Sequence, residues 1–348
     1  MLVSDFDFEL PPDSIAQAPP TDRESARLLV LDRSTPGVRH RSVGDLPALL
    51  TPGDLLVVND TRVFPARLLG QRVPSGGAVE CLLLGRHDAD RWDALMHPGQ
   101  KLRSGAMVRF DRDGRRLHAQ VLDRRFHGRR TVRLWTDDGS SVDDAIDSLG
   151  HIPLPPYIKR VDTRADAERY QTVYATVRGS IAAPTAGLHL STALLRRCDE
   201  RGIATARVTL HVGYGTFQPI RVDRVEDHRV ESEPFDVPQA TVDAIERTRA
   251  VGRRVVAVGT TTTRTLETVG RIGEGGIRAG SGVSDLYLYP GARFGVVDSL
   301  LTNFHLPRSS LLMLVSAFAG ADRIRDAYRE AIQTGYRFYS YGDAMLIL

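Results

Sequence analysis

Residues 255–267 read VVAVGTTTTRTLE, a pattern that predicts a strand running directly into a helix. The apolar VVAV segment before Gly259 predicts a strand covered on both faces, and the threonines before Leu266 predict the start of a helix. A helix N-terminus leaves backbone N–H groups unpaired and carries partial positive charge, which favours a bound carboxylate or phosphate. The alternative is a capping threonine beside a solvated arginine. The residues expected to hold an anion are Thr260, Thr261, Thr262, Thr263 and Arg264.

Helices and strands alternate from about residue 151 onward. Residues 192–202 (TALLRRCDERG) predict a helix that stops at a glycine, and residues 204–213 (ATARVTLHVG) predict the next strand. Residues 238–252 (PQATVDAIERTRAVG) predict another helix. Such alternation is typical of a mostly parallel α/β arrangement. The glycine-rich residues 271–285 (RIGEGGIRAGSGVSD) predict a mobile loop.

The first half of the chain has a different pattern of predicted elements. Residues 24–32 and 54–60 each predict a short strand, and from about residue 67 to 136 segments such as AVECLLL, AMVRF and RTVRLWT follow one another between turns. Regular short strands without a helical period predict a small antiparallel barrel or sandwich. We therefore expect an α/β domain of residues 1–66 and 151–348, interrupted by an inserted β domain of residues 67–150.

Charge is unevenly distributed along the chain. With 348 residues and 42% hydrophobic content, the chain has the size of about two globular domains. The net charge is only +3, but residues 101–133 hold eleven Lys or Arg against three Asp. Such a run is typical of a phosphate-facing surface, and its alternative is a solvated charged surface.

Cysteine content and hydropathy indicate where in the cell the protein is expected. Cys81 and Cys198 lie far apart and outside any Cys/His pattern, so neither a disulfide framework nor a metal site is expected. The acidic N-terminus does not resemble a signal peptide, and the apolar segment around Leu311 to Ala321 is too short to span a membrane. We expect a cytoplasmic protein without a membrane role, more often a monomer than an obligate oligomer.

Polar residues that follow predicted strands are the candidates for chemistry, because ligands of α/β sheets bind beyond the carboxyl ends of strands. Three such segments carry a histidine: APTAGLHL (183–190), TLHVGYGTF (209–217) and TNFHLPRSS (302–310). A single histidine on a strand is more often a hydrogen-bonded core residue, and Gly-x-Gly at 213–215 is too weak to indicate a dinucleotide fold. Likewise, Asp60-Thr-Arg62 could merely form an Asx turn. Three histidine-bearing loops together favour an enzyme.

Several common catalytic motifs are absent from the sequence. Gly-x-Ser-x-Gly, Gly-x-x-x-x-Gly-Lys and His-Glu-x-x-His do not occur, which argues against serine hydrolases, common nucleotide hydrolases and zinc proteases. The residues alone therefore indicate a cytosolic α/β enzyme with a basic β insert.

Taken together, long strings along nearly the whole chain resemble one family, the S-adenosylmethionine:tRNA ribosyltransferase-isomerases of queuosine biosynthesis. The strings include FDFELPPDSIAQ, GDLLVVNDTRVFPARL, HIPLPPYIKR, GSIAAPTAGLHL, TLHVGYGTFQPI, VGTTTTRTLE, LTNFHLPRSSLLMLVSAFAG and YRFYSYGDAMLI. The resemblance implies transfer of the ribosyl group of S-adenosylmethionine to 7-aminomethyl-7-deazaguanine in the wobble position of tRNA, giving epoxyqueuosine, adenine and methionine. It also implies an α/β domain interrupted by a β-barrel.

This chemistry needs a base and an acid. The sulfonium acidifies the 5′ carbon of the ribose, so a base can remove a proton there and a donor can assist adenine, and histidine has a pKa suited to both. The expected acid/base residues are His189, His211 and His305, with Glu233 and Asp343 orienting a histidine or the ribose hydroxyls and Asn303 donating to the base. Besides residues 260–264, the expected substrate-binding residues are Asp60, Arg62, Thr185, Gly187, Gly213, Tyr214 and Asn303. The expected tRNA contacts are Arg109, Arg115, Arg116, Arg124, Arg125, Arg129 and Arg130.

The sequence departs from the family pattern at two places. His228 and Glu233 match the expected His-x-Met-His-x-Glu, but Glu231 stands where the second histidine is expected. Val283 stands where a tryptophan is expected, so no stacking contact carries over from that segment.

Two other classes of function remain open. An S-adenosylmethionine-dependent tRNA methyltransferase would bind the same cofactor, but LLVLDRSTPG is not the glycine-rich turn such enzymes usually carry after the first strand. A non-catalytic tRNA-binding protein would explain the basic insert but not three polar strand ends.

Overall fold

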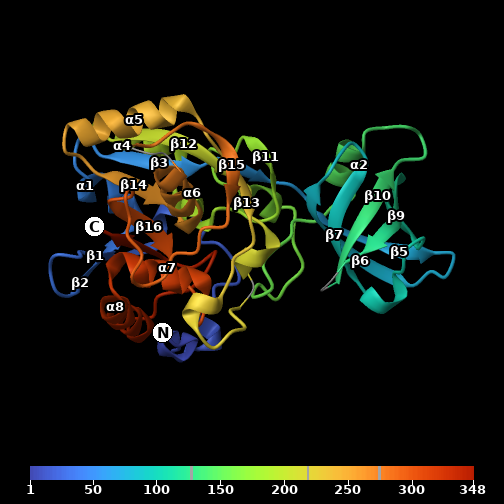
Figure 1. Ribbon diagram of the computed structural model, residues 1–348, viewed down its shortest axis with the longest axis horizontal. Coiled ribbons are helices and arrows are strands. Elements are labelled where there is room, and N and C mark those ends of the chain that lie inside the picture. The colour runs from blue at the N-terminus through green and yellow to red at the C-terminus, as the bar shows by residue number, and fades with distance from the viewer. Residues whose placement is uncertain (126–127, 218, 273–275) are drawn as a thin grey trace.

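The computed structural model describes residues 1–125, 128–217, 219–272 and 276–348. Two units lie side by side along the long axis of the molecule, an α/β unit on the left of Figure 1 and a β-barrel on the right. Within the described residues, no helix is both long enough and apolar enough to cross a membrane.

A nine-stranded mixed sheet forms the centre of the α/β unit. Its strands, in spatial order, are β15 (Gly280–Ser284), β13 (Glu233–Val237), β12 (Ala204–Leu210), β3 (Leu55–Asn59), β14 (Val255–Val258), β16 (Ser299–Asn303), β17 (Ala344–Ile347), β1 (Arg27–Leu31) and β2 (Val38–Ser42).

The middle of this sheet is parallel and both of its edges are antiparallel. Strand β3 pairs in parallel with β12 and β14, and β14 pairs in parallel with β16. Antiparallel pairs join β12 to β13, β13 to β15, β16 to β17 and β1 to β2, while β17 and β1 are parallel. The predicted fold class is confirmed, with a sheet that is more mixed than the sequence indicated.

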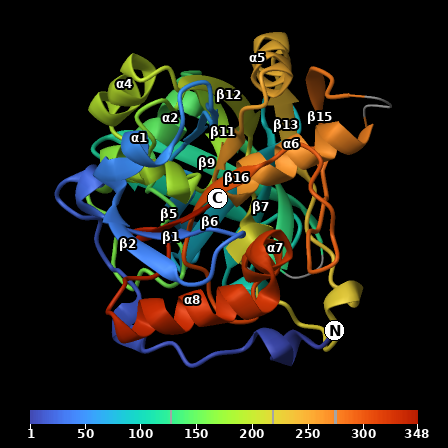
Figure 2. The same ribbon diagram turned by 90° about the vertical axis from the view of Figure 1, so that its left-hand side faces the viewer.

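Helices cover both faces of the sheet, and its central strands β3 and β14 are buried at every position. Leu55 and Val57 of β3 belong to one hydrophobic core, whereas Leu56 and Val58 belong to another. In Figure 2, α1 and α4 lie at the upper left, and α6, α7 and α8 lie to the right and below. The helices are α1 (Leu46–Leu49), α3 (Asp166–Arg169), α4 (Thr192–Glu200), α5 (Gln239–Ala250), α6 (Thr260–Ile272), α7 (Ser310–Ala319) and α8 (Ala321–Gln333).

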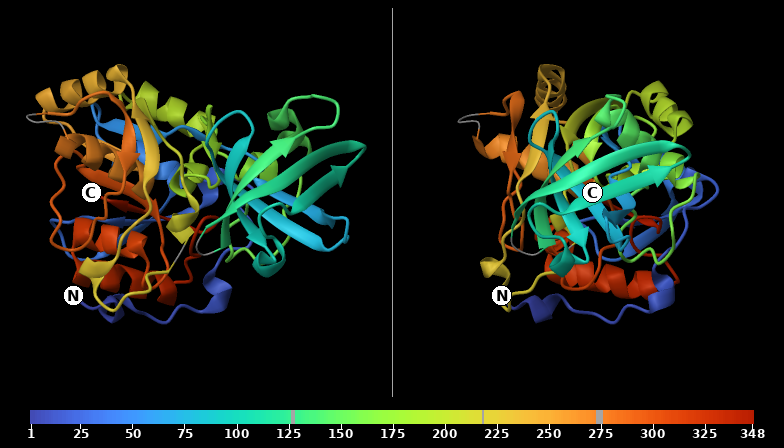
Figure 3. Two further views of the ribbon diagram at one scale, coloured as in Figure 1. Left: turned by 45° about the vertical axis from the view of Figure 1, so that its right-hand side comes forward. Right: turned by 90° about the vertical axis from the view of Figure 1, so that its right-hand side faces the viewer.

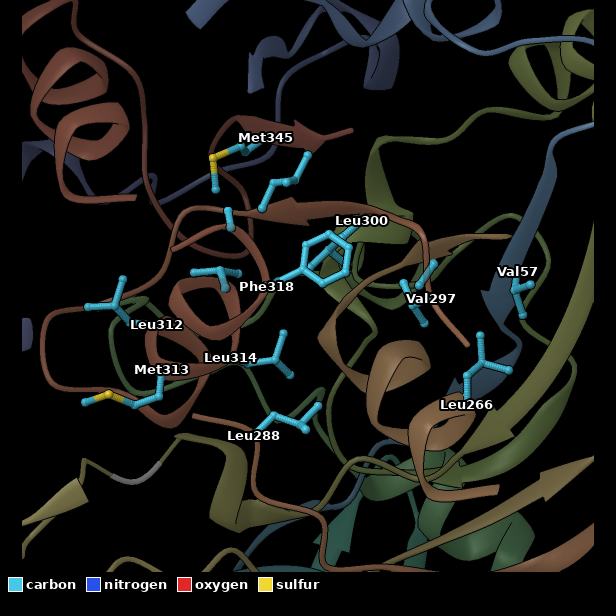
Figure 4. Close-up of a cluster of buried hydrophobic side chains, with 14 of the residues drawn as sticks. Val57, Leu266, Leu288, Val297, Leu300, Leu312, Met313, Leu314, Phe318 and Met345 are labelled. Carbon is cyan, nitrogen blue, oxygen red and sulfur yellow. The ribbon is translucent and has the colours of Figure 1, made fainter. Parts of the chain in front are cut away.

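The larger core lies between the sheet and α5 to α8. In Figure 4, Phe318 of α7 lies beside Leu300 of the sheet, and Leu312, Leu314 and Leu266 belong to the same core. All of these side chains are buried, so the helix that follows β14 is fixed firmly against the sheet.

The inserted unit is a closed antiparallel barrel, with strand order β10-β7-β6-β5-β8-β9 (Figure 3). Its interior is apolar, and α2 (Val142–Leu149) packs on its outer strands β8 and β9. The strands are β5 (Arg67–Val73), β6 (Ala78–Arg86), β7 (Arg91–His97), β8 (Met107–Arg112), β9 (Arg115–Arg124) and β10 (Arg129–Trp135). Of the two shapes open from the sequence, the barrel is the correct one.

The chain enters and leaves the barrel at neighbouring points. The backbone N–H of Arg67 donates to the carbonyl of His151 at 3.2 Å, and the N–H of His151 donates back at 2.8 Å. A separate two-stranded sheet, β4 (Thr61–Val63) with β11 (Val177–Ser180), lies on the α/β side of this junction.

The prediction of a mobile loop over residues 271–285 is wrong at residues 271–272 and 280–284, whereas residues 276–279 form neither helix nor strand. Helix α6 runs through Ile272, and Gly280–Ser284 forms the edge strand β15, paired with every residue of β13. The glycine content suggested a loop, but backbone hydrogen bonds to a neighbouring strand outweighed local propensity. Residues 273–275 lie outside the described residues.

Candidate active site

A cavity of about 190 Å³ lies beyond the carboxyl ends of β14 and β16. Because these two strands are parallel neighbours, the segments that follow them open at the same edge of the sheet. The polar residues of its lining are Tyr157, Thr185, Thr216, Thr260, Thr261, Thr302, Asn303, His305, Ser309, Tyr339 and Ser340. Five of the residues singled out in the sequence, from three distant segments, therefore meet in one cavity: Thr185, Thr260, Thr261, Asn303 and His305.

The first four threonines of α6 divide into two pairs. Gly259 adopts a φ of +93°, a conformation that favours glycine, and turns the chain from β14 into the helix. Thr260 and Thr261 line the cavity. Thr262 and Thr263 instead donate their hydroxyls back to the carbonyls of Val258 and Gly259, at 2.7 and 3.1 Å, and are completely buried. Their hydroxyls are therefore directed into the helix rather than toward a ligand.

Arg264 already holds an anion supplied by the protein. Its Nη1 atom lies 2.5 Å from Oε2 of Glu233, and it also donates to the carbonyls of Leu286 and Ser284 at 3.0 and 3.1 Å. The other oxygen of Glu233 accepts from the Gly213 N–H at 2.7 Å and from Thr216 at 2.9 Å. Arg264, Glu233 and Gly213 therefore belong to one buried network.

Asn303 is the centre of a second network at the cavity. Its Oδ1 atom accepts from the Thr185 hydroxyl at 2.9 Å, and its amide nitrogen donates to Nε2 of His189 at 2.9 Å and to the carbonyl of Tyr339 at 3.2 Å. Burial, with a smaller contribution from the Arg337 charge, lowers the pKa of His189 to about 4. His189 is therefore neutral near pH 7, and its Nε2 atom accepts a hydrogen bond.

His305 is the histidine that lines the cavity directly. Its Nε2 atom lies 3.0 Å from Oγ1 of Thr302, and its backbone N–H donates to the Tyr328 hydroxyl at 3.0 Å. Burial lowers its pKa to about 3. The sequence suggested a histidine with a pKa near working pH, and for His305 and His189 that expectation is wrong because both rings are almost completely shielded from water.

His211 lies apart from the other two. Its Nδ1 atom is 2.7 Å from the Thr61 hydroxyl, and burial lowers its pKa while the charge of Asp60 partly offsets this. Asp60 itself accepts from the hydroxyls of Thr209 and Thr176 at 2.7 and 2.9 Å. These contacts tie strand ends together outside the cavity lining.

Asp343 was expected in the site but does not line the cavity. Its two oxygens accept the backbone N–H groups of Arg27 and Arg337 at 3.0 and 2.8 Å, and it is buried. Among the described residues, neither Asp343 nor Glu233 is hydrogen-bonded to a histidine, so the expected orienting contacts are not formed. Asp343 closes the turn before the last strand.

The remaining expected binding residues lie around the cavity rather than in it. Gly187 is required by close packing, since a Cβ there would lie 2.1 Å from the Tyr174 hydroxyl. Arg62 is exposed and lines an open groove elsewhere on the α/β unit, and Tyr214 lines a cleft of about 380 Å³ between that unit and the barrel.

Sequence reasoning missed several cavity residues. Tyr339 and Ser340 lie close to Asp343 but were not among the expected residues, and Tyr157 lies in a proline-rich segment without a strand end. The Tyr157 hydroxyl lies 2.5 Å from Oγ of Ser340. The signal that could have indicated them is the dense run of aromatic residues in YRFYSYGD. Among the described residues, no group of His, Cys, Asp and Glu is arranged to hold a metal ion.

A family model described as queuosine biosynthesis protein matches residues 3–347. The chain belongs to the queuosine biosynthesis protein family. It is 51% identical, over the full length of both chains, to proteins named S-adenosylmethionine:tRNA ribosyltransferase-isomerase from Heliobacterium modesticaldum and Moorella thermoacetica. It is also similar to the crystal structure of S-adenosylmethionine tRNA ribosyltransferase from Thermotoga maritima, with 38% identity, a TM-score of 0.56, and coverage of 99% of this chain and 100% of that chain. The resemblance found in the sequence is confirmed.

In this queuosine biosynthesis protein, carboxylates of the protein compensate much of the basic run on the barrel. Arg109 and Arg116 pair with Asp111 at 2.5 and 2.8 Å, Arg125 lies 3.6 Å from Asp93, and Arg129 pairs with Glu231 of the α/β unit. Arg115 donates to the Ser148 hydroxyl at 2.8 Å, and Arg124 is exposed and makes no side-chain ion pair among the described residues.

Arg130 was expected to contact tRNA, but the structure gives it another role. Its side chain is buried at the end of the barrel, and it donates to the carbonyls of Leu102, Arg129 and Gly99 at 3.0, 2.9 and 2.7 Å. Those three acceptors occupy the guanidinium, so this arginine ties loops to the barrel rather than presenting a charge to a phosphate.

The structure also shows the surroundings of the residues in the two segments that depart from the family pattern. Glu231 forms the ion pair with Arg129 that joins the two units, a contact that a neutral histidine would not make. His228 packs edge-on against Tyr287, with ring centroids 5.0 Å apart. Val283 is 63% exposed on β15, so the position offers a surface to solvent rather than a core contact.

Proposed function

We propose that this chain is an S-adenosylmethionine:tRNA ribosyltransferase-isomerase, the activity for which its relatives are named. It transfers and isomerises the ribosyl moiety of S-adenosylmethionine onto 7-aminomethyl-7-deazaguanine in the wobble position of tRNA, and releases adenine and methionine. The observation that carries the proposal is the cavity beyond β14 and β16, where a helix N-terminus, a buried histidine and an amide network face one space.

S-adenosylmethionine occupies this cavity in the proposal. Its carboxylate lies against the start of α6, where Thr260 and Thr261 supply hydroxyls and the first turn supplies unpaired N–H groups. Its sulfonium lies near the aromatic rings of Phe304 and Tyr339, because aromatic faces attract cations.

His305 is the base. If its Nε2–H donates to Thr302, then Nδ1 carries the lone pair, and Nδ1 has no hydrogen-bond partner among the described residues. The ring removes a proton from the 5′ carbon next to the sulfonium. A low pKa guarantees that the ring is unprotonated at pH 7, although it also weakens the base, so the sulfonium and the fixed geometry must supply the remaining assistance.

The same residue can act as the acid. Once His305 carries the proton, its low pKa makes the imidazolium a strong acid. Transfer of this proton to adenine then assists the departure of adenine. The amine of the deazaguanine then attacks, and epoxide closure expels methionine. His189 acts through Asn303 and is a positioning residue, since its ring reaches the cavity by way of that amide.

The barrel contributes to tRNA binding in this proposal. Arg115 and Arg124, with the ion-paired Arg109, Arg116, Arg125 and Arg129, contact backbone phosphates rather than bases, because such contacts need charge but no fixed sequence. Residues 1–66 and 151–348 form the catalytic domain and residues 67–150 the inserted domain. In this proposal the protein acts as a monomer in the cytoplasm.

Product analysis tests the function directly. The enzyme is incubated with S-adenosylmethionine and tRNA that carries the 7-aminomethyl-7-deazaguanine, and small-molecule products are quantified. Free adenine and methionine in equal amounts are expected. S-adenosylhomocysteine would instead identify a methyltransferase, and tRNA binding without any product would identify a binding protein.

A further inference from the structure

A second concave surface lies on the α/β unit, close to the cavity but separate from it. It is an open groove of about 1010 Å³ formed by residues 21–23, Arg62, residues 164–175 and the start of α4. The segment Thr185–His189 lies between the two spaces. Thr185 lines the cavity, whereas the carbonyl of Leu188 accepts from Arg23 of the groove at 2.7 Å.

The groove holds four arginines that have no carboxylate partner. Arg23, Arg62, Arg164 and Arg169 line it, and none of them forms an ion pair among the described residues. Arg23 and Arg169 instead donate to backbone carbonyls, for example Arg23 to Gln171 at 3.0 Å. These contacts fix the guanidinium groups in position without an ion pair, and the nearby carboxylate of Glu168 acts on Arg23 only through its charge. The acidic residues of the groove are Asp22 and Glu168.

Polar side chains accompany this charge. Thr172 lines the groove and is 95% buried. Ser191 and Thr192, at the start of α4, line the same groove. The Ser191 hydroxyl already donates to Glu24 and accepts the Leu194 N–H.

The contrast with the barrel is informative. On the barrel, carboxylates already pair with Arg109, Arg116, Arg129 and Arg133, so a phosphate would have to displace them. In the groove, two of the four arginines, Arg62 and Arg164, are exposed and make no side-chain hydrogen bond among the described residues. A phosphate can approach them without breaking an existing contact.

We propose that this groove binds backbone phosphates of the tRNA substrate and so forms a second tRNA contact, on the catalytic unit itself. The inference rests on the proposed function, because tRNA is the polyanion of that reaction. An open groove with several separate guanidinium groups suits a chain of phosphodiesters, since each phosphate can meet its own cation. The segment Thr185–His189 places this contact next to the reacting cavity.

The experiment uses the full chain with Arg62 and Arg164 replaced together by alanine. Both side chains are exposed, so the fold is expected to survive. The KM for tRNA should rise about ten- to thirtyfold at physiological salt, and the slope of log affinity against log salt should fall by about 1.5. The KM for S-adenosylmethionine should stay unchanged. Arg247→Ala, an exposed arginine of α5 without an ion pair, is the matched control and should change none of these values.

The outcomes separate the two proposals. If the wild-type enzyme releases no adenine in the presence of tRNA, the proposed function fails. If it does release adenine but the double variant keeps the wild-type KM and salt slope, the groove inference alone fails. Replacing both arginines by lysine should restore most of the affinity, because lysine keeps the charge. Inorganic phosphate is the last probe. If phosphate protects the wild-type fold but the double variant keeps the wild-type affinity for tRNA, the groove is a small-anion site. That result would overturn the tRNA contact.

Discussion

The Nη1 atom of Arg264 lies 2.5 Å from Oε2 of Glu233, and both side chains are shielded from water. Glu233 begins β13, whereas Arg264 lies in the second turn of α6, so the pair fastens the edge of the sheet to the helix that opens onto the cavity. The arginine that the sequence suggested as a substrate ligand is therefore already neutralised by the protein. Its effect on the substrate passes through the position of α6.

The first prediction concerns this pair. Arg264→Ala leaves the Glu233 carboxylate buried without its partner, and breaking a buried pair in this way costs about 3–5 kcal/mol of unfolding free energy. Urea denaturation measures the loss. Arg264→Met combined with Glu233→Gln removes both charges and should recover much of the stability. If that double variant is stable but binds S-adenosylmethionine about tenfold or more weakly, Arg264 contacts the substrate after all.

The second prediction assigns the base. His305→Asn should lower turnover about 10²- to 10⁴-fold with little change in S-adenosylmethionine affinity, because general acid–base assistance acts on the reaction step. Single-turnover adenine release measures it. His211→Asn is the matched control, since His211 is a partly buried histidine outside the cavity lining, and its effect should be small. Near wild-type adenine release by folded His189, His211 and His305 variants would make a carboxylate such as Glu233 the leading base.

The third prediction is a pH dependence of stability. The folded pKa values of His189 and His305, about 4 and about 3, lie below the value of about 6.5 for an unfolded histidine. As the pH falls below about 6.5, the unfolded chain takes up protons first, so the stability present at neutral pH is lost progressively toward pH 4. Each histidine should contribute about 1.4 kcal/mol per pH unit in this window.

Urea denaturation between pH 7 and pH 5 measures this dependence. Replacing His305 by glutamine should make the curve flatter, because the variant has one fewer group to protonate on unfolding. An identical slope for the variant and the wild type would show that His305 is protonated in the folded chain.

The fourth prediction separates two kinds of barrel arginine. Replacing the surface residues Arg124 and Arg125 by alanine should flatten the salt dependence of tRNA binding without altering barrel stability, because these side chains are exposed. Arg130→Ala should instead destabilise the barrel, since three carbonyls lose their donor. Fluorescence titrations at several salt concentrations and thermal denaturation distinguish the two effects. The reverse pattern would mean that Arg130 turns outward on binding tRNA.

The architecture was predictable wherever local pattern and topology agree. VVAV followed by glycine and threonines indicated β14 and α6, because an apolar strand and a polar helix start differ strongly in composition. The glycine-rich segment around Gly280 was misread, because its strand character comes from pairing with β13, a partner distant in sequence. Its own residues carry no strand signal.

The site was predictable only as a set of segments. The rule that chemistry lies at strand ends placed Thr185, Asn303 and His305 correctly in one cavity. It could not show that Asp343 accepts backbone N–H groups or that Arg130 is buried, because these roles depend on which partners the folded chain brings near. Pairing between residues far apart in the chain, such as the Asp343 carboxylate with the Arg27 N–H, leaves no local trace in the sequence.

The backbones of Arg67 and His151 are hydrogen-bonded to each other, so the barrel begins and ends at one point of the α/β unit. Because the chain leaves the α/β unit and returns to it across one pair of hydrogen bonds, a two-residue turn could join the two positions with little loss of chain entropy. A shortened protein of this kind would expose Ile181, which packs against the barrel core, and would need a polar residue there. Excision at this joint would leave the α/β unit with its cavity and its arginine groove, but without the phosphate contacts proposed for the barrel.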